Sequence, residues 1–518
     1  MGMGQIGMGP SGRTMLVLGL LALGACTVGP DYKTPGWSAP GSWFSRRPDL
    51  PKPGPSMPVA EPMDAEWWTM FQDPQLTSLE RRVVAQNLDV RTAAVRIAEA
   101  RAQLGIARAS LFPNINGNGS YTREKASNEG VFTAFPGASG SSAPGSSASG
   151  ATGTFGAGGI PASGIPPFDI YQYGLSASWE LDLWGRVRRS VESAQASELA
   201  SVEAQRGVLL SALADVARDY IQLRGAQLRL AIARENLQSS EQSLQLTQQR
   251  AAGGVTTDLD VANASAQVHT ISAEIPGLEQ QAASLINALS LLLGQPPNAL
   301  RADLEEAKPV PPVPPEVPVG LPGELVRRRP DIRQAEAQLH GATADIGVAV
   351  ANFYPSVTLN GSFGFQALQW NTLWDLNARQ YAFGPGITLP IFQGGQLRST
   401  LQLRKAQQQE AAIAWQKALL QAWHDVDNAL TAYRTEQARR DQLSAAVAQN
   451  RQALGLAQSR YQQGVTSFLD VLDAQRSLLA TQQSLADATT TVSTNLVALY
   501  RALGGGWEAD LPVMASRE

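Results

Sequence analysis

The sequence predicts a mainly α-helical protein with a membrane β-barrel, built from two copies of a strand-hairpin and long-helix-hairpin unit. Three observations support this fold class. The 518-residue chain contains an internal duplication, it has two very long stretches of helix-forming residues, and short segments alternate strictly between apolar and polar residues. A duplication of this length determines the architecture, because each copy repeats the same set of elements.

The duplication is visible in two sets of matched segments. Residues 254–261 (GVTTDLDV) recur 210 positions later as residues 464–471 (GVTSFLDV). Residues 87–90 and 111–113 (NLDV, LFP) match residues 329–332 and 353–355 (RPDI, FYP) with an offset of 242. The first copy therefore carries extra residues, which fall in a stretch rich in Gly, Ser, Ala and Pro near Ser127 to Pro167.

Two proline-free stretches, at about 186–250 and 396–463, predict the long helices. Ala, Gln, Leu, Arg and Glu dominate them, and these are good helix formers. A helix of this length would reach roughly 100 Å. Such helices cannot be buried in a compact globule, so they must pack lengthwise on other helices. An ordinary coiled-coil stalk is the alternative interpretation.

Four segments predict strands. Apolar and polar residues alternate without a break from Tyr171 to Leu183, and the same alternation recurs over 381–391, over 356–365 and, more weakly, over 115–121. Their lengths suit tilted membrane-spanning strands; the alternative is a half-buried sheet in a water-soluble domain. Four strands cannot close a barrel with a lumen, and lipid forbids an open edge, so several chains must contribute; three would supply twelve strands. We expect the loop at 127–167 to be flexible and to lie outside the cell, and the second strand pair to be joined by a short loop near 370–377.

The first residues have the proportions of a bacterial lipoprotein signal. Arg13 is the only charge before an apolar run from Met15 to Leu23, which is too short for a permanent membrane helix. Leu23-Gly24-Ala25 precedes Cys26, the only cysteine in the chain, so the pattern predicts cleavage after residue 25 and acylation of Cys26. An ordinary secretory signal with a chance cysteine is the alternative. Thr27 favours the outer membrane over retention in the inner membrane.

Composition argues against several other classes. The formal net charge is −4, from 41 basic and 45 acidic residues, which argues against a nucleic-acid partner, since such a partner requires a basic stripe. His269, His340 and His424 are isolated and show no metal-ligand spacing. The sequence contains no catalytic or phosphate-binding motif, and we expect no enzymatic activity, no metal and no cofactor.

The chain resembles the outer membrane factors, which are the TolC-like exit ducts of tripartite efflux pumps, in their acylated NodT-type branch. Five stretches in order carry the resemblance: Cys26 to Tyr32 (CTVGPDY), Trp67 to Leu76 (WWTMFQDPQL), Trp179 to Arg186 (WELDLWGR), Arg327 to Arg333 (RRRPDIR) and Tyr461 to Ala474. The resemblance implies a homotrimer with a twelve-stranded barrel in the outer membrane and a periplasmic α-helical tunnel. It also implies a periplasmic adaptor (membrane fusion protein) and an inner-membrane pump of the RND type as partners, and a belt formed by residues 310–322 and 504–507.

These observations predict the following domain organisation. The segments are a signal peptide (1–25), a lipidated extended segment (26–75), a first repeat (76–295), a Pro-rich linker (296–322), a second repeat (323–503) and a C-terminal tail (504–518), with strands near 114–122, 170–184, 356–366 and 381–392 and with tips near 254 and 464.

The two tips should contain the mechanism. Gly254 and Gly464 suit the turn between antiparallel helices, because glycine accepts the left-handed conformation that ends a helix. Thr256 and Thr466 are expected to cap the returning helices. By resemblance, the adaptor would contact the tips at Gly254, Val255, Thr256, Gly464, Val465 and Thr466.

Three acids follow the tip glycines. Asp260, Asp470 and Asp473 lie within about the first two turns of the returning helices, and Asp470 and Asp473 share one helix face. The plain interpretation is that they stabilise helix N-termini through the dipole. The resemblance instead aligns Asp470 and Asp473 with acids that ring the aperture, and Tyr461 and Asp260 with a hydrogen-bonded pair of the closed state. Some family members have an arginine at the position of Thr466, so this chain departs from that pattern.

The resulting functional interpretation is a passive exit duct, gated at its periplasmic aperture, lipid-anchored in the cell outer membrane. A duct for type I protein secretion or for metal efflux is an alternative. A trimeric surface fibre or adhesin is a further one, although a stalk needs neither two strand hairpins nor two matching tips. The sequence does not select the exported substrate, the adaptor or the pump.

Overall fold

The computed structural model describes residues 27–38, 56–59, 61, 64–125, 167–320 and 322–507. The chain divides into two compact units. The strand unit comprises residues 1–30, 105–191 and 345–403, and the helical unit comprises residues 31–104, 192–344 and 404–518.

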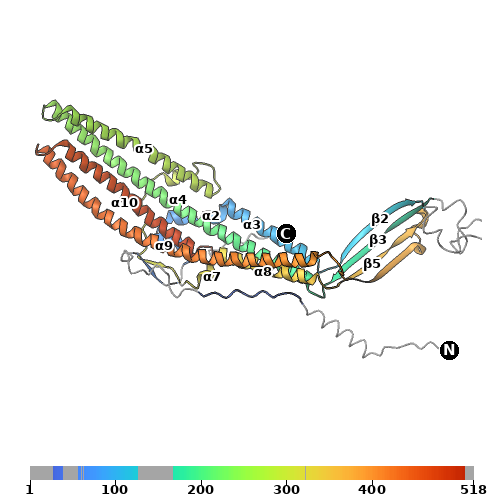
Figure 1. Cartoon of the computed structure of the whole chain (residues 1–518). Coiled ribbons are helices and arrows are strands. Elements are labelled where there is room, and N and C mark those ends of the chain that lie inside the picture. Colours follow the sequence, from blue (N-terminus) through green and yellow to red (C-terminus); the bar gives the residue numbers. More distant parts are fainter. Residues whose placement is uncertain are drawn as a thin grey trace, which may run out of the picture. The chain divides into compact units, whose positions relative to one another are not determined.

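The strand unit contains one four-stranded antiparallel sheet in the order β2-β3-β5-β6. Its strands are β2 (Asn114–Glu124), β3 (Phe168–Leu181), β5 (Ser356–Ala367) and β6 (Arg379–Thr388), and Figure 1 shows β2, β3 and β5 side by side. Two short 3-10 turns, η3 (Trp370–Thr372) and η4 (Leu376–Ala378), connect β5 to β6. Within the described residues β2 pairs only with β3 and β6 only with β5, so both outer strands present open edges.

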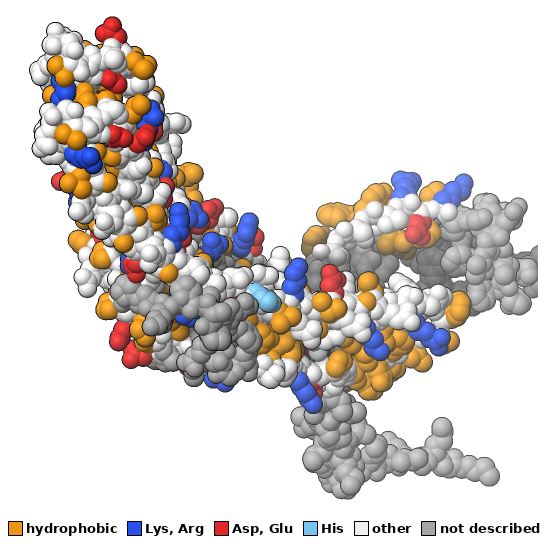
Figure 2. All heavy atoms as spheres, turned by 60° about the vertical axis from the view of Figure 1, so that its left-hand side comes forward, with side chains coloured by type: hydrophobic (Ala, Val, Ile, Leu, Met, Phe, Trp, Pro, Cys, Tyr) orange, Lys and Arg blue, Asp and Glu red, His pale blue; other side chains and the backbone are white. Residues whose placement is uncertain are grey.

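One face of this sheet is apolar and exposed. The register places Leu175 between Gly117 and Phe363, with Tyr381 beyond, and the side chains of Leu175, Phe363 and Tyr381 are 56%, 53% and 70% exposed. Figure 2 shows hydrophobic side chains gathered over the strands. An exposed apolar face of this extent is typical of contact with lipid or with another protein surface.

The other face carries small polar side chains. The amide of Asn118 donates to Ser176 at 2.8 Å, and the hydroxyl of Ser178 donates to Asn360 at 3.0 Å. These bonds join neighbouring strands across the sheet. The alternation that predicted the strands is thus expressed as two chemically different faces.

Two strands end earlier than the sequence pattern indicated. β3 ends at Leu181 rather than near residue 184, and β6 ends at Thr388 rather than near residue 392. Pro390 cannot donate a ladder hydrogen bond, which explains the earlier end of β6. At the end of β3, Glu180 pairs with Arg186 at 2.5 Å, and just beyond it Asp182 pairs with Arg188 at 3.3 Å, so these carboxylates fix the start of the following helix.

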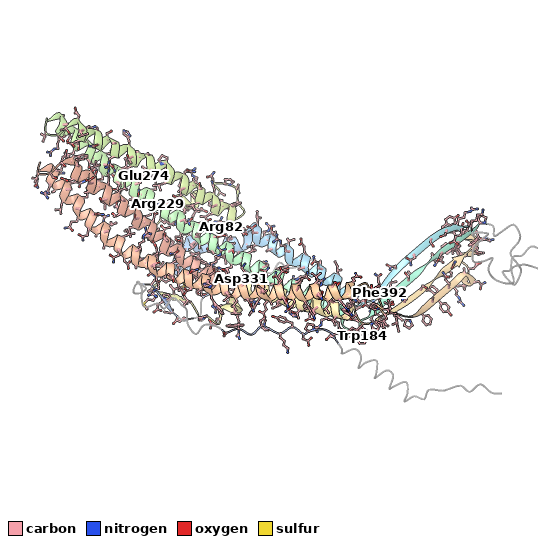
Figure 3. All side chains as sticks on the ribbon, in the orientation of Figure 1. Arg82, Trp184, Arg229, Glu274, Asp331 and Phe392 are labelled. Carbon is pink, nitrogen blue, oxygen red and sulfur yellow. The ribbon has the colours of Figure 1, made fainter. Side chains whose placement is uncertain are left out.

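The residues that follow the predicted cleavage site contact the rest of the strand unit. The N–H of Val28 donates to the carbonyl of Trp184 at 3.1 Å. Gly185 has φ +82°, and a Cβ there would lie 2.9 Å from Cγ2 of Thr27, so only glycine permits this close approach. Figure 3 labels Trp184 at this strand-to-helix junction and Phe392 at the equivalent junction after β6.

The helical unit is dominated by two antiparallel helix hairpins. The first joins α4 (Arg186–Ala252) to α5 (Asp258–Leu292), and the second joins α9 (Gln396–Gln462) to α10 (Phe468–Leu503); Figure 1 shows both turns at the same end. The remaining helices are η1 (Trp67–Phe71), α2 (Pro74–Gln86), α3 (Leu88–Ala109), α6 (Arg301–Leu304), α7 (Leu325–Arg328) and α8 (Pro330–Ala351). No helix in the described ranges combines the length and the hydrophobicity needed to cross a membrane.

Polar contacts join the two hairpins along their length. Arg229 of α4 pairs with Asp487 of α10 at 3.2 Å, and Gln483 of α10 donates to Glu274 of α5 at 2.8 Å. Figure 3 labels Arg229 and Glu274 on the first hairpin. The hairpins therefore pack lengthwise on each other, as helices of this length require.

The main core of the helical unit is aromatic. Trp67, Trp68 and Phe71 are at most 1% exposed, and Trp67 stacks on Tyr500 of α10 with 5.2 Å between ring centroids. Large aromatic side chains contribute most to such cores because each removes a large apolar area from water.

A buried arginine holds the segment that leaves the first hairpin. Arg224 of α4 is fully buried and donates to the carbonyl of Glu306 and to the side chain of Gln75, both at 2.7 Å. Gln227, one turn later, donates to the carbonyl of Leu304 at 2.7 Å. We call Arg224, Gln75 and Gln227 the linker clasp, because they fix the start of the Pro-rich linker.

The Pro-rich linker then packs along the second hairpin. Its strand β4 (Glu316–Pro318) pairs in parallel with β1 (Met57–Val59). Tyr433 of α9 donates to Ser56 at 2.7 Å, and Ser493 of α10 donates to the carbonyl of Pro311 at 3.1 Å. Ser56 in turn donates to the carbonyl of Pro314, so the linker is held directly by α10 and, through Ser56, by α9.

Glu80 of α2 is a buried carboxyl without a partner in the described structure. It is 0% exposed, and neither of its oxygens has a hydrogen bond. Burial alone raises the pKa of Glu80 well above its ordinary value. A raised folded-state pKa means that stability is greatest below the unfolded-state pKa of about 4.3 and is lost as the pH rises toward the folded-state pKa.

We therefore expect Glu80→Gln to stabilise the helical unit at neutral pH by about 1–3 kcal/mol, because an amide avoids the cost of protonating the carboxyl on folding, about 1.4 kcal/mol for each pKa unit. Thermal unfolding in detergent should show a higher midpoint for Glu80→Gln at pH 7, and a difference that shrinks toward pH 4. Glu99→Gln, on the exposed side of α3, is the control and should behave as wild type at both pH values. A pH-independent difference would contradict the assignment to Glu80 ionisation.

Candidate functional site: the paired hairpin tips

Both tips end their first helix with the same hydrogen-bonded turn. Gly254 and Gly464 have φ values of +73° and +75°. The N–H of Val255 donates to the carbonyl of Arg250, and the N–H of Val465 donates to that of Arg460, each at 2.9 Å. This is the Schellman arrangement, in which a left-handed glycine follows the helix and the next N–H reaches back.

The helix caps lie one residue later than the sequence indicated. The N-cap residues are Thr257 and Ser467, not Thr256 and Thr466. Because the glycine turn occupies the residues through Val255 and Val465, the returning helices begin only at Asp258 and Phe468. Thr257 and Asp260 form a capping box, whereas Ser467 makes no side-chain cap bond.

Two of the three predicted acids have local roles. Asp260 and Asp470 are both the third residue of their helix. The hydroxyl of Thr256 donates to Asp260, and that of Thr466 donates to Asp470. The threonines first assigned as caps therefore orient these carboxylates at a helix N-terminus, where negative charge is favourable.

Asp473 has no such local explanation. It is exposed, lies one turn beyond Asp470 on the same helix face, and makes no hydrogen bond or ion pair within the described part of the chain. The duplicate position in the first tip is Asn263, which is uncharged. An exposed carboxylate present in one copy only fits a role outside helix capping.

Tyr461 and Asp260 are not joined within this chain. Tyr461 is 5% exposed, its hydroxyl has no hydrogen-bond partner, and it lines a cavity of about 170 Å³ with Ser243 and Phe468. Asp260 instead accepts from Thr256 and Thr257. The hydrogen bond expected from the family resemblance is therefore not formed within one chain.

Arg250 makes a contact between the tips that sequence reasoning missed. Its guanidinium donates through Nη1 to the carbonyls of Tyr461 at 2.9 Å and Gln462 at 3.1 Å, and lies 4.7 Å from the centre of the Tyr461 ring. The arginine of the first tip thus caps the last turn of α9. The matched arginine at position 460 was the available sequence signal, because both arginines stand four residues before the tip glycine.

Each tip also exposes a pair of apolar side chains. Val255 and Leu259 are 65% and 68% exposed, and the duplicates Val465 and Leu469 are 62% and 51% exposed. Leu259 and Leu469 were missing from the predicted tip residues. Matched exposed apolar groups at both tips are typical of a docking surface or of a constriction.

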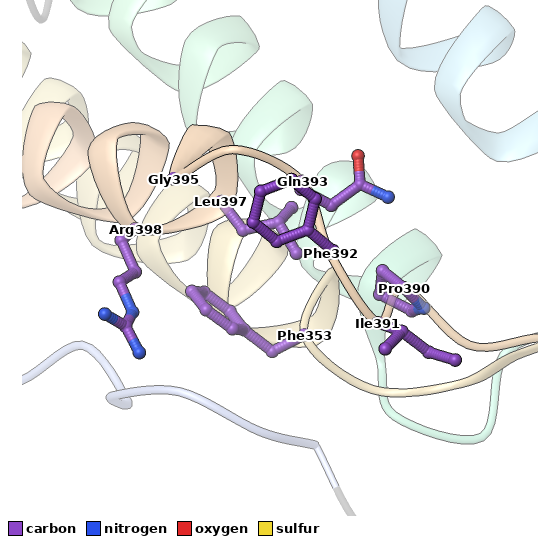
Figure 4. A pocket seen from close by; sticks show the side chains of 8 residues that line it. All are labelled: Phe353, Pro390, Ile391, Phe392, Gln393, Gly395, Leu397 and Arg398. Atoms are coloured by element: carbon purple, nitrogen blue, oxygen red, sulfur yellow. The ribbon is translucent and has the colours of Figure 1, made fainter.

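The strand unit contains a separate apolar pocket. It has a volume of about 340 Å³ and lies where β6 leads into α9; Figure 4 shows the rings of Phe353 and Phe392 beside Leu397, with Arg398 at its edge. Phe392 is 86% exposed within one chain.

The predicted lipidation residue Cys26 lies outside the described residues.

Comparison with known proteins places this architecture in a family. Residues 79–295 and 321–505 match the outer membrane efflux protein family. Outer membrane protein OprJ of Pseudomonas aeruginosa is 33% identical over 498 residues, which cover 96% of each chain. Nodulation protein T of Rhizobium leguminosarum bv. trifolii is 33% identical over 94% of this chain and 96% of its own. The solved structure of the outer-membrane channel OprN has a TM-score of 0.82 at 34% identity and covers 93% of this chain and 100% of that one.

The chain belongs to the outer membrane efflux protein family, in the branch that includes nodulation protein T. The predicted fold class, mainly α-helical with a membrane β-barrel and an α-helical tunnel, is confirmed by the structural relatives. The predicted function, an outer membrane channel component of an efflux system, is confirmed at the level of the family.

Proposed function

We propose that three copies of this chain form the exit duct of a tripartite efflux pump of the RND type. The observation that carries the proposal is the four-stranded sheet with one exposed apolar face, one polar face and two open edges. Three such sheets, with β6 of one chain beside β2 of the next, supply twelve strands without an edge, as a membrane requires. The polar face then lines the lumen.

The hairpin tips form the gate of this duct. In a trimer the six tips surround one axis, and Asp473 contributes a ring of three carboxylates beside those of Asp470. Carboxylate rings select cations and narrow a pore. The exposed pairs Val255–Leu259 and Val465–Leu469 supply an apolar surface on which a periplasmic adaptor docks. Docking that favours separated tips opens the duct.

Single-channel recording of the purified protein in planar bilayers, with the oligomeric mass measured in the same detergent, tests this function. A trimer with a small cation-preferring conductance supports a duct that is closed at rest. A stable trimer with no conductance under any voltage contradicts the duct and would favour a surface fibre.

The cargo is selected by the inner-membrane pump, which is a separate protein. Type I protein secretion and metal efflux therefore stay alternative uses of the same duct. Reconstitution with candidate adaptors, scored by retention of the adaptor on the immobilised trimer, would separate these uses.

The mature N-terminus is anchored through a lipid on Cys26. Support comes from the signal pattern before Cys26 and from the bond of Val28 to Trp184, which holds the next residues at a strand end. We expect Cys26→Ser to abolish metabolic palmitate labelling while trimers still form, because the strands themselves hold the protein in the membrane. Thr27→Ser is the control and should keep the label. Persistent labelling of Cys26→Ser would refute the anchor.

A further inference from the structure

We propose that Arg460 joins neighbouring chains by capping the end of α4 in the next chain, as Arg250 caps the end of α9 within one chain. The partner is a second copy of this chain, and the inference rests on the proposed trimer. It assigns the tip contact between chains to a side chain that makes no hydrogen bond, ion pair or ring contact among the described residues.

We call the contact of Arg250 with the end of α9 the joint within a chain. It is the model for the proposed joint between chains, in which Arg460 contacts the end of α4. Arg250 belongs to the last turn of α4 and donates to the carbonyls of Tyr461 and Gln462, which end α9. Its guanidinium also lies beside the second turn, because a Cβ on Gly464 would be 3.8 Å from Nη2 of Arg250. A cation at the carbonyl end of a helix satisfies free acceptors and complements the helix dipole.

The duplication gives both hairpins an arginine and helix-end carbonyls at matching positions. Arg460 corresponds to Arg250, and its guanidinium is exposed with no hydrogen bond, ion pair or ring contact among the described residues. The carbonyls that correspond to those of Tyr461 and Gln462 belong to Ala251 and Ala252. Ala252 is exposed, and its carbonyl accepts no hydrogen bond in the described chain. One chain thus has a free donor on its second hairpin and a free acceptor on its first.

Ring closure brings these two groups together. Around the axis of a trimer, α4–α5 hairpins alternate with α9–α10 hairpins. Every second contact between neighbouring hairpins is therefore a contact between two chains. A ring is built from head-to-tail contacts, in which the free side of one unit meets the complementary free side of the next. The acceptors are backbone carbonyls, so the contact does not depend on the side chains. It can form although the positions that correspond to Tyr461 and Gln462 are alanines.

The joint between chains lacks one component of the joint within a chain. Arg250 lies over the ring of Tyr461, whereas the corresponding position 251 is alanine and has no ring. A cation over an aromatic ring adds to the attraction of the charge for the helix end. The joints between chains are therefore the weaker set, and the duct opens by separation of neighbouring chains while the two tips of each chain stay together.

Cross-linking of cysteine pairs tests the geometry. Arg460→Cys with Ala252→Cys, treated with a short bismaleimide in membranes, should yield covalent dimers and trimers on denaturing gels. Arg250→Cys with Gln462→Cys is the matched control, and it should link within one chain and leave only monomers. The single variant Arg460→Cys shows whether the native Cys26 takes part.

The outcomes separate this proposal from the trimer itself. Trimers on native gels with only monomeric products from the 460/252 pair would overturn the assignment of Arg460 and leave the duct intact. A protein that is monomeric on native gels would overturn both. Covalent trimers from the 460/252 pair support both.

Channel recordings test the difference between the two joints. Ala251→Tyr supplies the missing ring and should reduce the frequency of openings several-fold, whereas Arg460→Ala should increase it. Arg460→Lys should fall between wild type and Arg460→Ala, because an ammonium still donates to a carbonyl but lacks the planar fork. Equal opening frequencies in Arg460→Ala and wild type would overturn the proposed role in gating.

Discussion

Replacing Asp473 in the channel should change both its selectivity and its conductance. Asp473→Asn removes the charge at constant size, so the preference for cations should fall by on the order of tenfold, the lower range by which clustered charge concentrates counter-ions. Asp473→Ala also shortens the side chain, so the open current should rise as well. Reversal potentials in a salt gradient measure the first effect, and single-channel currents in symmetric salt measure the second.

Two further variants make this result specific. Asp470→Asn should alter selectivity less than Asp473→Asn does, because the Asp470 carboxylate accepts the hydroxyl of Thr466 and lies at the helix N-terminus. Asp258→Asn places the same change on the exposed first residue of α5 and serves as the control. The contrary outcome is wild-type selectivity and current in Asp473→Asn, in Asp473→Ala and in the double variants that also replace Asp470. That outcome would exclude these acids from the aperture.

Arg224→Met should be among the most destabilising single changes in the helical unit. It removes the donor to the carbonyl of Glu306 and to the buried side chain of Gln227, while Lys308 still donates to Gln75. Two hydrogen bonds to a charged group, at about 1.5–3 kcal/mol each, give a loss of about 3–6 kcal/mol. The measurement is thermal unfolding in detergent, accompanied by limited proteolysis of the Pro-rich linker (296–322).

The control for this change is another arginine of the same helix. Arg234 of α4 forms an ion pair with Glu279, and the two side chains are 59% and 51% exposed. Arg234→Met should therefore cost no more than about 1 kcal/mol. Arg224→Lys separates charge from geometry, since a lysine cannot reach both acceptors with a planar fork. Equal unfolding midpoints for Arg224→Met and Arg234→Met would show that the linker clasp does not hold the fold.

The sequence was most informative where a period extends over many residues. The alternation around Tyr171 to Leu183 predicted β3 and its two faces, and the proline-free stretches predicted α4 and α9 to within a few residues. The glycines at 254 and 464 predicted the turns because few other residues accept a positive φ. Helix caps were displaced by one residue, since the length of a Schellman turn is decided by backbone bonds and not by the first threonine available.

Contacts between distant segments were not predictable in this way. Arg250 reaches Tyr461 across 211 positions, and Arg224 reaches Glu306 across 82. An arginine in a helix rich in polar residues has the sequence pattern of a solvated side chain. Only the residues packed against it in the structure show that it makes such contacts. The same holds for Glu80, whose burial contradicts the usual preference of glutamate for the surface.

The open edges of β2 and β6 have a consequence for biogenesis and for genetics. A lone chain entering a bilayer would expose a row of unpaired backbone groups to hydrocarbon, at several kcal/mol each. In the proposed trimer, insertion and association are a single thermodynamic event, so we expect channel yield to rise more steeply than in proportion to the amount of chain synthesised. A chain in which one of the edges β2 and β6 is defective can still pair through its other edge with a wild-type chain. It then enters the same assembly and prevents closure of the barrel. Such alleles would be dominant over the wild-type copy.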